Sequence, residues 1–315
     1  MPIQLVDGCK QIEMVVHDVN GAVEFMRRTL GAERIEQKLV RRITGHVLHI
    51  DHVDCGQGMF QFCSLITDDQ PHKRYIERYG PMLTNLNFSV VDQPGADRVI
   101  AAEGGRTLSS FPMADMGWES LLDPDNVRPH DEMGDGIFSE TRELIGFDLE
   151  YAHPPYRDPA RQDVFYPAFA QPRPPCADHV TRLLRLRAIV HDLDRTLATV
   201  ERMIDPRSRT AAYALRSDSR GRSARIRLLD FEIEYCEPAG PASPWFEYLQ
   251  RFEQGLSTAV FAVADLDAVI AGMDRADLVR TTAQFIDSHE PMTAAFRLNS
   301  KHILGFDIEL FEARP

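Results

Sequence analysis

The sequence predicts an α+β fold in which a βαβββ unit occurs four times. Residues 13–33 and 187–204 share one pattern, a β-rich run that ends in Val-His-Asp and continues into a helix. Residues 80–92 and 253–265 share a second pattern, in which a turn with Gly and Leu leads into an alternating strand that ends in Asp. The four copies then close with the strands GMFQFCSL, GFDLEYA, DFEIEYCE and GFDIELFE.

The strand and helix of each copy follow from local patterns. In the first copy, apolar and polar residues alternate over residues 12–16 as in a half-buried strand, and apolar residues recur at helical spacing over 23–30. Asp18 or Asn20 can accept hydrogen bonds from the first helical N–H groups, and Gly31 can end the helix. The corresponding capping residues of the other copies are Asp92, Asp192 or Asp194, and Asp265.

A proline-rich segment divides the four copies into two pairs. Residues 153–175 contain seven prolines, which can neither donate to a strand ladder nor continue a helix. We therefore predict an N-terminal domain over residues 5–152, a linker over 153–179 and a C-terminal domain over 180–313.

Composition limits the kind of partner. The chain of 315 residues, 43% of them hydrophobic, can bury a large core and is long enough for two domains. A formal charge of -13 argues against a nucleic-acid partner, because such proteins present clustered Lys and Arg. No secretory signal and no apolar run of membrane-spanning length is visible. We expect a cytoplasmic protein with no nucleic-acid or membrane partner.

The paired βαβββ units, the Val-x-Asp strand ends and the closing Gly-Phe-Asp-x-Glu resemble the vicinal oxygen chelate superfamily. The likeness covers nearly the whole chain. This superfamily includes glyoxalase I, extradiol ring-cleaving dioxygenases, methylmalonyl-CoA epimerase, fosfomycin-modifying enzymes and metal-free antibiotic-binding proteins such as bleomycin resistance protein. The resemblance implies two tandem domains, in each of which two units curl into a half-open cup with the helices outside. Such a fold does not fix the chemistry.

Strand alternation predicts which side chains face each cup. The first cup is predicted to be rich in amides and acids, with Gln11, Glu13, His17, Gln61, Asn85, Asn87, Asp148 and Glu150 directed inward. The second is predicted to hold Arg185, Arg187, His191, Glu232, Glu234, Thr258, Asp307 and Glu309. Arginines among carboxylates favour a structural ion-pair cluster, and recognition of an acidic ligand is the alternative.

The resemblance also implies where a metal would bind. In metal-dependent relatives a ligand opens the first strand of each unit and a Glu closes the last. The matching positions are Gln11, Gln61, Asn85 and Glu150 in the first half, and Arg185, Glu234, Thr258 and Glu309 in the second. Arginine cannot ligate a cation, and the first set lacks histidine, which transition metals favour. We therefore favour no cofactor, with a hard divalent ion such as Mg(II) at the first set as the alternative.

One further group of possible ligands lies in residues 45–54, which contain His46, His49, Asp51 and His52. We interpret these histidines as exposed residues of a hairpin, because the ligands of the superfamily lie elsewhere. A metal site there is the less favoured alternative.

Function follows from the first cup. We predict an enzyme of the isomerase, lyase or hydrolase type that acts on a small oxygen-rich molecule through carboxylate acid–base chemistry. The predicted catalytic residues are Glu150, Asp148 and Glu13, and the predicted substrate-binding residues are Gln11, Gln61, Asn85, Asn87 and His17. The alternatives are a metal-free protein that sequesters a small molecule, and a divalent-metal enzyme of the glyoxalase or ring-cleaving type. A homodimer is compatible with the sequence, which names neither substrate nor oligomeric state.

Overall fold

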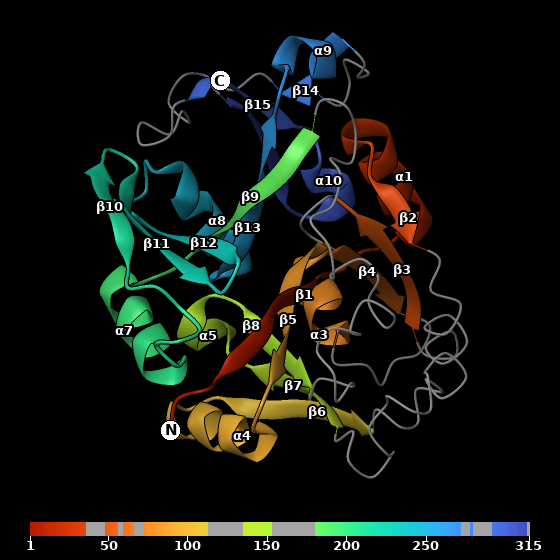
Figure 1. The fold of residues 1–315 in the computed structure, drawn as a ribbon. Coiled ribbons are helices and arrows are strands. Elements are labelled where there is room, and N and C mark those ends of the chain that lie inside the picture. Colours follow the sequence, from red (N-terminus) through yellow and green to blue (C-terminus); the bar gives the residue numbers. More distant parts are fainter. Residues whose placement is uncertain are drawn as a thin grey trace.

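A computed structural model describes residues 1–35, 48–55, 59–65, 72–112, 135–152, 180–271, 278–279 and 292–313. The predicted linker over residues 153–179 lies outside the described residues. Within them, the chain forms two eight-stranded sheets, one from each half of the sequence (Figure 1). None of the described helices is long and apolar enough to cross a membrane.

The first half has the elements β1 (Leu5–Val15), α1 (Val19–Leu30), β2 (Glu33–Ile35), β3 (Leu48–Asp54), β4 (Met59–Leu65), α3 (Lys73–Tyr79), β5 (Met82–Val90), α4 (Gln93–Ala102), β6 (Arg106–Pro112), β7 (Asp135–Glu140), α5 (Arg142–Ile145) and β8 (Asp148–Ala152). The second half has β9 (Val180–Ile189), α7 (Leu193–Met203), β10 (Tyr213–Asp218), β11 (Gly221–Leu228), β12 (Phe231–Pro238), α8 (Pro244–Phe252), β13 (Gly255–Val263), α9 (Leu266–Ala271), β14 (Leu278–Val279), β15 (Met292–Leu298), α10 (Lys301–Leu304) and β16 (Asp307–Ala313).

The strand order confirms the predicted repeat of βαβββ units. The first sheet runs β2-β3-β4-β1-β5-β8-β7-β6, and the second runs β10-β11-β12-β9-β13-β16-β15-β14. In each sheet the first strand of a unit is parallel to the last strand of the same unit, and the two opening strands pair antiparallel at the centre. Each half therefore repeats one arrangement, and positions in the two sheets can be compared one by one.

The capping residues lie where the sequence places them. The side chain of Asp18 accepts from the N–H of Gly21 at 3.0 Å, and Asp92 and Asp192 accept in the same way at 2.9 Å. Gly31 ends α1 in the left-handed conformation. These caps fix the point at which the opening strand ends and its helix begins.

The two sheets share one apolar core. Phe60 of β4 stacks on Phe306 beyond α10, with ring centroids 6.3 Å apart, and it also contacts Phe261 of β13. The outward-facing residues Leu86 and Phe88 of β5 belong to the same buried cluster. The side chains that alternate with them, including Asn85 and Asn87, lie on the opposite, polar face of the first sheet. We call this polar face the N-terminal cup, and the matching face of the second sheet the C-terminal cup.

Candidate functional site

A row of polar residues crosses the N-terminal cup from strand to strand. His52 of β3 pairs in register with Gln61 of β4, and Gln61 pairs with Glu13 of β1. Glu13 in turn pairs with Asn85 of β5, which pairs with Asp148 of β8. Neighbours in register point to the same face of a sheet, so five polar side chains lie side by side. All five are buried.

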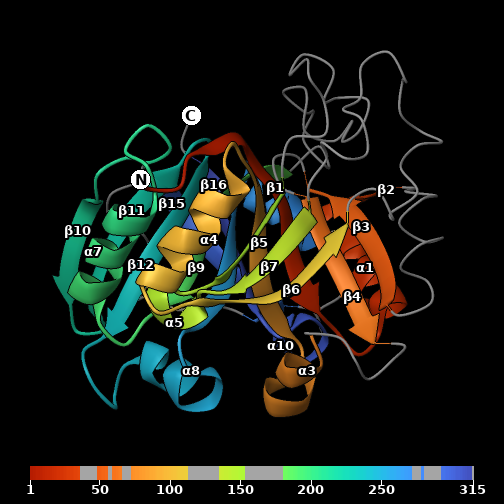
Figure 2. The same ribbon diagram turned by 90° about the horizontal axis from the view of Figure 1, so that it is seen from below.

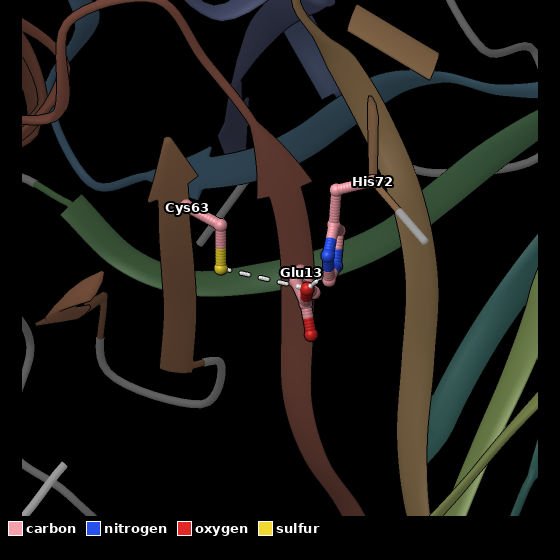
Figure 3. A group of neighbouring side chains, drawn as sticks. All are labelled: Glu13, Cys63 and His72. Carbon is pink, nitrogen blue, oxygen red and sulfur yellow. Dashed lines mark hydrogen bonds and ion pairs between the residues drawn. The ribbon is translucent and has the colours of Figure 1, made fainter. Parts of the chain in front are cut away.

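Glu13 is the centre of this row, and its two oxygens face different partners. Oε1 contacts Nε2 of His72 and lies 3.5 Å from Sγ of Cys63 (Figure 3). Oε2 accepts a hydrogen bond from Nδ2 of Asn85 at 3.1 Å. The same Nδ2 donates to Oε2 of Glu150 at 2.7 Å. One amide group therefore bridges two buried carboxyl groups.

The two bridged carboxyl groups differ in their electrostatics. Burial raises the pKa of Glu150 well above its ordinary value, and the nearby charge of Glu13 and a hydrogen bond with it act in the same direction. Burial also opposes ionisation of Glu13, but the charge and hydrogen bond of His72 and the donor of Asn85 lower its pKa overall. The surroundings therefore favour a proton on Glu150 and a negative charge on Glu13.

His52 and Gln61 form a buried hydrogen-bonded pair beside Glu13 and Glu150. Nε2 of His52 lies 2.8 Å from Oε1 of Gln61 and 3.4 Å from Nε2 of Gln11. Burial lowers the pKa of His52 to about 4, so the imidazole is neutral at pH 7. Nε2 of Gln61 then points to Sγ of Cys63, at 3.4 Å. The interpretation of His52 as an exposed hairpin residue is wrong, because strand pairing turns it into the cup, where it is only 1% exposed.

Asp148 lies in the row, but its carboxylate turns toward α5. Its Oδ1 accepts from the backbone N–H groups of Thr141 and Arg142, each at 2.9 Å. Its Oδ2 accepts from Nη2 of Arg74 at 3.1 Å. Burial raises the pKa of Asp148 to about 6, against the opposing charge of Arg74. Asp148 therefore caps the start of α5, and its carboxylate lies apart from the Glu13–Glu150 pair.

Of the remaining predicted residues, Asn87 lies beside the other predicted residues and His17 lies apart from them. Asn87 pairs in register with both Gln11 and Glu150, and a hydrogen bond from Asn87 stabilises the charged form of Glu150. His17 is exposed and follows the end of β1, at the turn into α1. It is not brought together with the other predicted residues, because the strand alternation on which its prediction rests ends at Val15.

Two of the oxygens in the predicted metal-ligand set have hydrogen-bond partners within the protein. Oε1 of Gln61 is taken by His52, and Oδ1 of Asn85 accepts from the Thr84 hydroxyl at 2.7 Å. A different group does converge, since one donor atom each of Glu13, Cys63 and His72 lie within 4.8 Å of one another. Carboxylate, thiolate and imidazole suit a borderline ion such as Zn(II). Burial and the charge of Glu13, however, raise the pKa of the Cys63 thiol well above its ordinary value.

Two members of this group are absent from the sequence-based prediction. Cys63 lies two residues after Gln61 on β4, so strand alternation could have identified it. His72 immediately precedes α3 and follows residues outside the described range, so no strand period points to it. Its ring packs edge-on against Phe138, with centroids 5.5 Å apart.

The C-terminal cup has the opposite charge at its centre. Register places Arg187 of β9 between Glu234 and Thr258, where the first sheet has Glu13 between Gln61 and Asn85. Arg187 donates to Glu234 and to Glu309 at 3.0 Å each. Although burial acts against ionisation, Arg187, Arg185 and Arg225 lower the pKa of Glu234 to about 2. Arg187 therefore pairs with two of the buried carboxylates of this cup, which is the arrangement of an ion-pair cluster.

Comparison with known proteins identifies the fold. No family model matches the chain, and no curated protein matches it. Solved structures do match. A mutant of 4-hydroxymandelate synthase from Streptomyces coelicolor aligns over 100% of this chain and 95% of its own length, with 14% identity and a TM-score of 0.64. A fusion protein of a xylose isomerase-like TIM barrel and a 4-hydroxyphenylpyruvate dioxygenase aligns over 100% and 50%, with 12% identity and a TM-score of 0.55. At these identities the similarity shows the fold alone.

Proposed function

We propose that this chain, which has the vicinal oxygen chelate fold, is an enzyme that transfers protons to and from a small oxygen-rich molecule in the N-terminal cup. The observation that carries the proposal is the bridge of Asn85 between Glu13 and Glu150. Two buried carboxyl groups held apart by one donor differ in protonation, and a proton donor and a proton acceptor at the same pH are what acid–base catalysis requires.

The residues of the pair have separate roles in this mechanism. Glu150 keeps its proton because burial and the charge of Glu13 disfavour its ionised form, so it acts as the general acid toward a substrate oxygen. Glu13 stays ionised beside His72 and supplies the negative charge that holds the proton on Glu150. Asn87 and Gln11, which face each other in register, can donate hydrogen bonds to substrate hydroxyl or carbonyl groups. Isomerisation, elimination and hydrolysis can each use such a set.

The second cup is a weaker candidate for the same chemistry. Its buried carboxylates Glu234 and Glu309 both bind Arg187, and the low pKa of Glu234 leaves it without a proton to donate at neutral pH. We therefore place the reaction in the N-terminal half of the chain.

The proposal is tested with Glu150→Gln, which keeps the shape of the side chain and removes the acid. Wild type is first screened against hydroxylated and carbonyl compounds to find one that is turned over. We expect Glu150→Gln to lower turnover of that compound by about 10²- to 10⁴-fold, the usual loss on removal of a general acid or base. Glu201→Gln, an exposed change on α7, serves as the control. Unchanged turnover in Glu150→Gln, or tight binding by wild type with no turnover of any compound, would contradict the proposal.

A second candidate function is a metal-dependent enzyme, and the convergence of Glu13, Cys63 and His72 is the observation that favours it. A divalent ion held there would supply Lewis-acid activation of a substrate oxygen. Elemental analysis of protein purified without chelators distinguishes the candidates. A stoichiometric metal that is lost in Cys63→Ser and in His72→Gln, and retained in Glu150→Gln, would favour the metal-dependent enzyme. Less than about a tenth of an equivalent in wild type would favour proton transfer by the carboxyl pair alone.

A further inference from the structure

A strained residue lies at the boundary between the two halves. Glu253, which follows the last residue of α8, has φ 58° and ψ -152°. This region of backbone conformation is almost restricted to glycine. The equivalent position in the first half, directly after α3, is Gly80, with φ 79° and ψ -159°. The repeat therefore uses glycine once and glutamate once for the same turn, and the glutamate requires an explanation.

The surrounding structure holds this backbone in place. The guanidinium of Arg142 in α5 donates to the carbonyl of Phe252 and to the carbonyl of Gln254, which flank Glu253 on both sides. The side-chain amide of Gln254 donates back to the carbonyl of Arg142 at 2.5 Å. Strained residues persist where neighbours determine their geometry in this way, and they are frequent at functional sites.

The side chain of Glu253 reaches from the second half to α3 of the first half. Its Oε1 contacts Nη2 of Arg78, and its Oε2 accepts from the hydroxyl of Tyr79 at 2.7 Å. Figure 2 shows α3 and α8 at the same edge of the molecule, where the rings of Tyr79 and Phe252 lie 6.4 Å apart. Burial and the hydrogen bond to Glu253 raise the pKa of Tyr79, so its hydroxyl keeps the proton that it donates.

Helix α3 connects this contact to the candidate site. The carbonyl of His72 accepts from the N–H groups of Tyr75 and Ile76 at 3.0 and 3.2 Å, so His72 belongs to the first turn of α3. The side chain of His72 contacts Glu13. A pocket of about 200 Å³, lined by α3, α5 and Glu253, lies along the helix, so packing does not fill the space on that side. A displacement of α3 would therefore also move His72, whose side chain contacts Glu13.

From these contacts we infer that Glu253 is a positioning residue, which holds α3 so that His72 stays against Glu13. The strain at Glu253 is retained because glycine at this position would fit the backbone but could not bind Arg78 or Tyr79. The effect on turnover rests on the proposed function of the cup, whereas the effect on α3 does not.

Glu253→Gly separates the backbone strain of this residue from its side-chain contacts. Glycine relieves the strain and removes the contacts with Arg78 and Tyr79 of α3. We expect it to leave the melting temperature unchanged or higher, while amide hydrogen exchange of the last turn of α3 becomes at least about tenfold faster. We expect kcat to fall about tenfold with little change in KM, because a misplaced His72 affects the reaction more than substrate binding. Glu253→Gln, which still accepts from Tyr79, should recover part of both losses.

Ala214→Gly is the matched control, since Ala214 also has a positive φ, of 51°, and makes no contact with α3 among the hydrogen bonds of the described residues. It should leave exchange in α3 unchanged. Unchanged exchange of α3 in both Glu253→Gly and Arg78→Ala would overturn the inference. Faster exchange in Glu253→Gly, together with full turnover in Glu150→Gln, would uphold the positioning of α3 and reject the proposed function instead.

Discussion

At the scale of single residues, the N-terminal cup shows how the pKa of one residue type can shift in opposite directions. Glu13 and Glu150 are both buried and share the Nδ2 donor of Asn85. Among the described hydrogen bonds, His72 contacts only Glu13, and this contact lowers the pKa of Glu13. The difference in pKa therefore comes from what lies beside each carboxyl group and not from the residue itself.

Asn85→Asp tests the bridge between the two carboxyl groups. An ionised Asp cannot donate a hydrogen bond and adds a second negative charge beside that of Glu13, so we expect a loss of roughly 1–3 kcal/mol in unfolding free energy at pH 7. A protonated Asp can donate again. Its native pKa is expected to be raised, so the loss should shrink as the pH falls toward 5. Thermal unfolding at both pH values checks this. Asn20→Asp, exposed on α1, is the control, and equal melting temperatures for wild type and Asn85→Asp at pH 7 would contradict the role of the bridge.

At the scale of elements, the opening strands β1 and β9 carry opposite charges at equivalent positions. Glu13 and Arg187 each lie between the closing strand of their unit and the opening strand of the next. In β9 the guanidinium binds two carboxylates directly, and Arg185, which is fully buried, adds contacts of 3.5 and 3.6 Å to Glu234 and Glu232. The same strand architecture thus carries a pair of carboxyl groups bridged by an amide in one cup and a cluster of ion pairs in the other.

Arg187→Ala is expected to destabilise the protein strongly. It removes the arginine that binds Glu309 and the nearest of the arginines around Glu234, and breaking a buried ion pair costs roughly 3–5 kcal/mol in comparable cases. Urea unfolding measures the loss. Arg202→Ala, which removes a surface pair with Glu103, is the control and should cause a clearly smaller change. A stable Arg187→Ala variant that no longer binds or converts the substrate would show that the functional cup is the C-terminal one.

At the scale of the whole molecule, the two halves are bound together by more than the chain that joins them. The N–H of Ile3 donates to the carbonyl of Met203 at 2.7 Å, and the N–H of Leu5 donates to the hydroxyl of Ser208 at 2.9 Å. The halves also meet at other points of their boundary. Phe60 stacks on Phe306, and Glu253 accepts a hydrogen bond from Tyr79 of α3. The N-terminal cup therefore depends on the second half for its geometry.

Limited proteolysis should cut the proline-rich segment between Ala152 and Val180 first, because a proline can neither continue a helix nor donate to a strand ladder. We expect the two fragments to remain together on size-exclusion chromatography, since the contacts between the halves do not depend on the linker. Mass spectrometry of the fragments gives the cut positions. A protease-resistant core that spans residues 153–179 would reject the predicted boundary, and fragments that separate would show that the halves associate only weakly.

The sequence predicted the fold well because its signals are local. Alternation along β5 and the cap at Asp92 are visible without any knowledge of distant residues. Alternation also placed Glu13, Gln61, Asn85 and Glu150 on the polar face. It could not show that Asp148 turns to cap α5, nor that His72 enters the cup, because both depend on packing between elements. Register shifts between β1 and β5 likewise decide that Glu13 stands between Gln61 and Asn85.

The protonation state of Glu150 is the most direct test of the account. Carbon-13 NMR of the glutamate carboxyl groups, with Glu150 assigned by its absence in Glu150→Gln, follows this group without any substrate. We predict that Glu150 stays protonated at pH 7 and that Glu13 is already ionised there. The raised pKa of Glu150 then contributes stability that is complete at low pH and is lost as the pH rises through its native pKa. A Glu150 carboxyl that titrates near the ordinary value of about 4.3 would contradict the proposed proton donor.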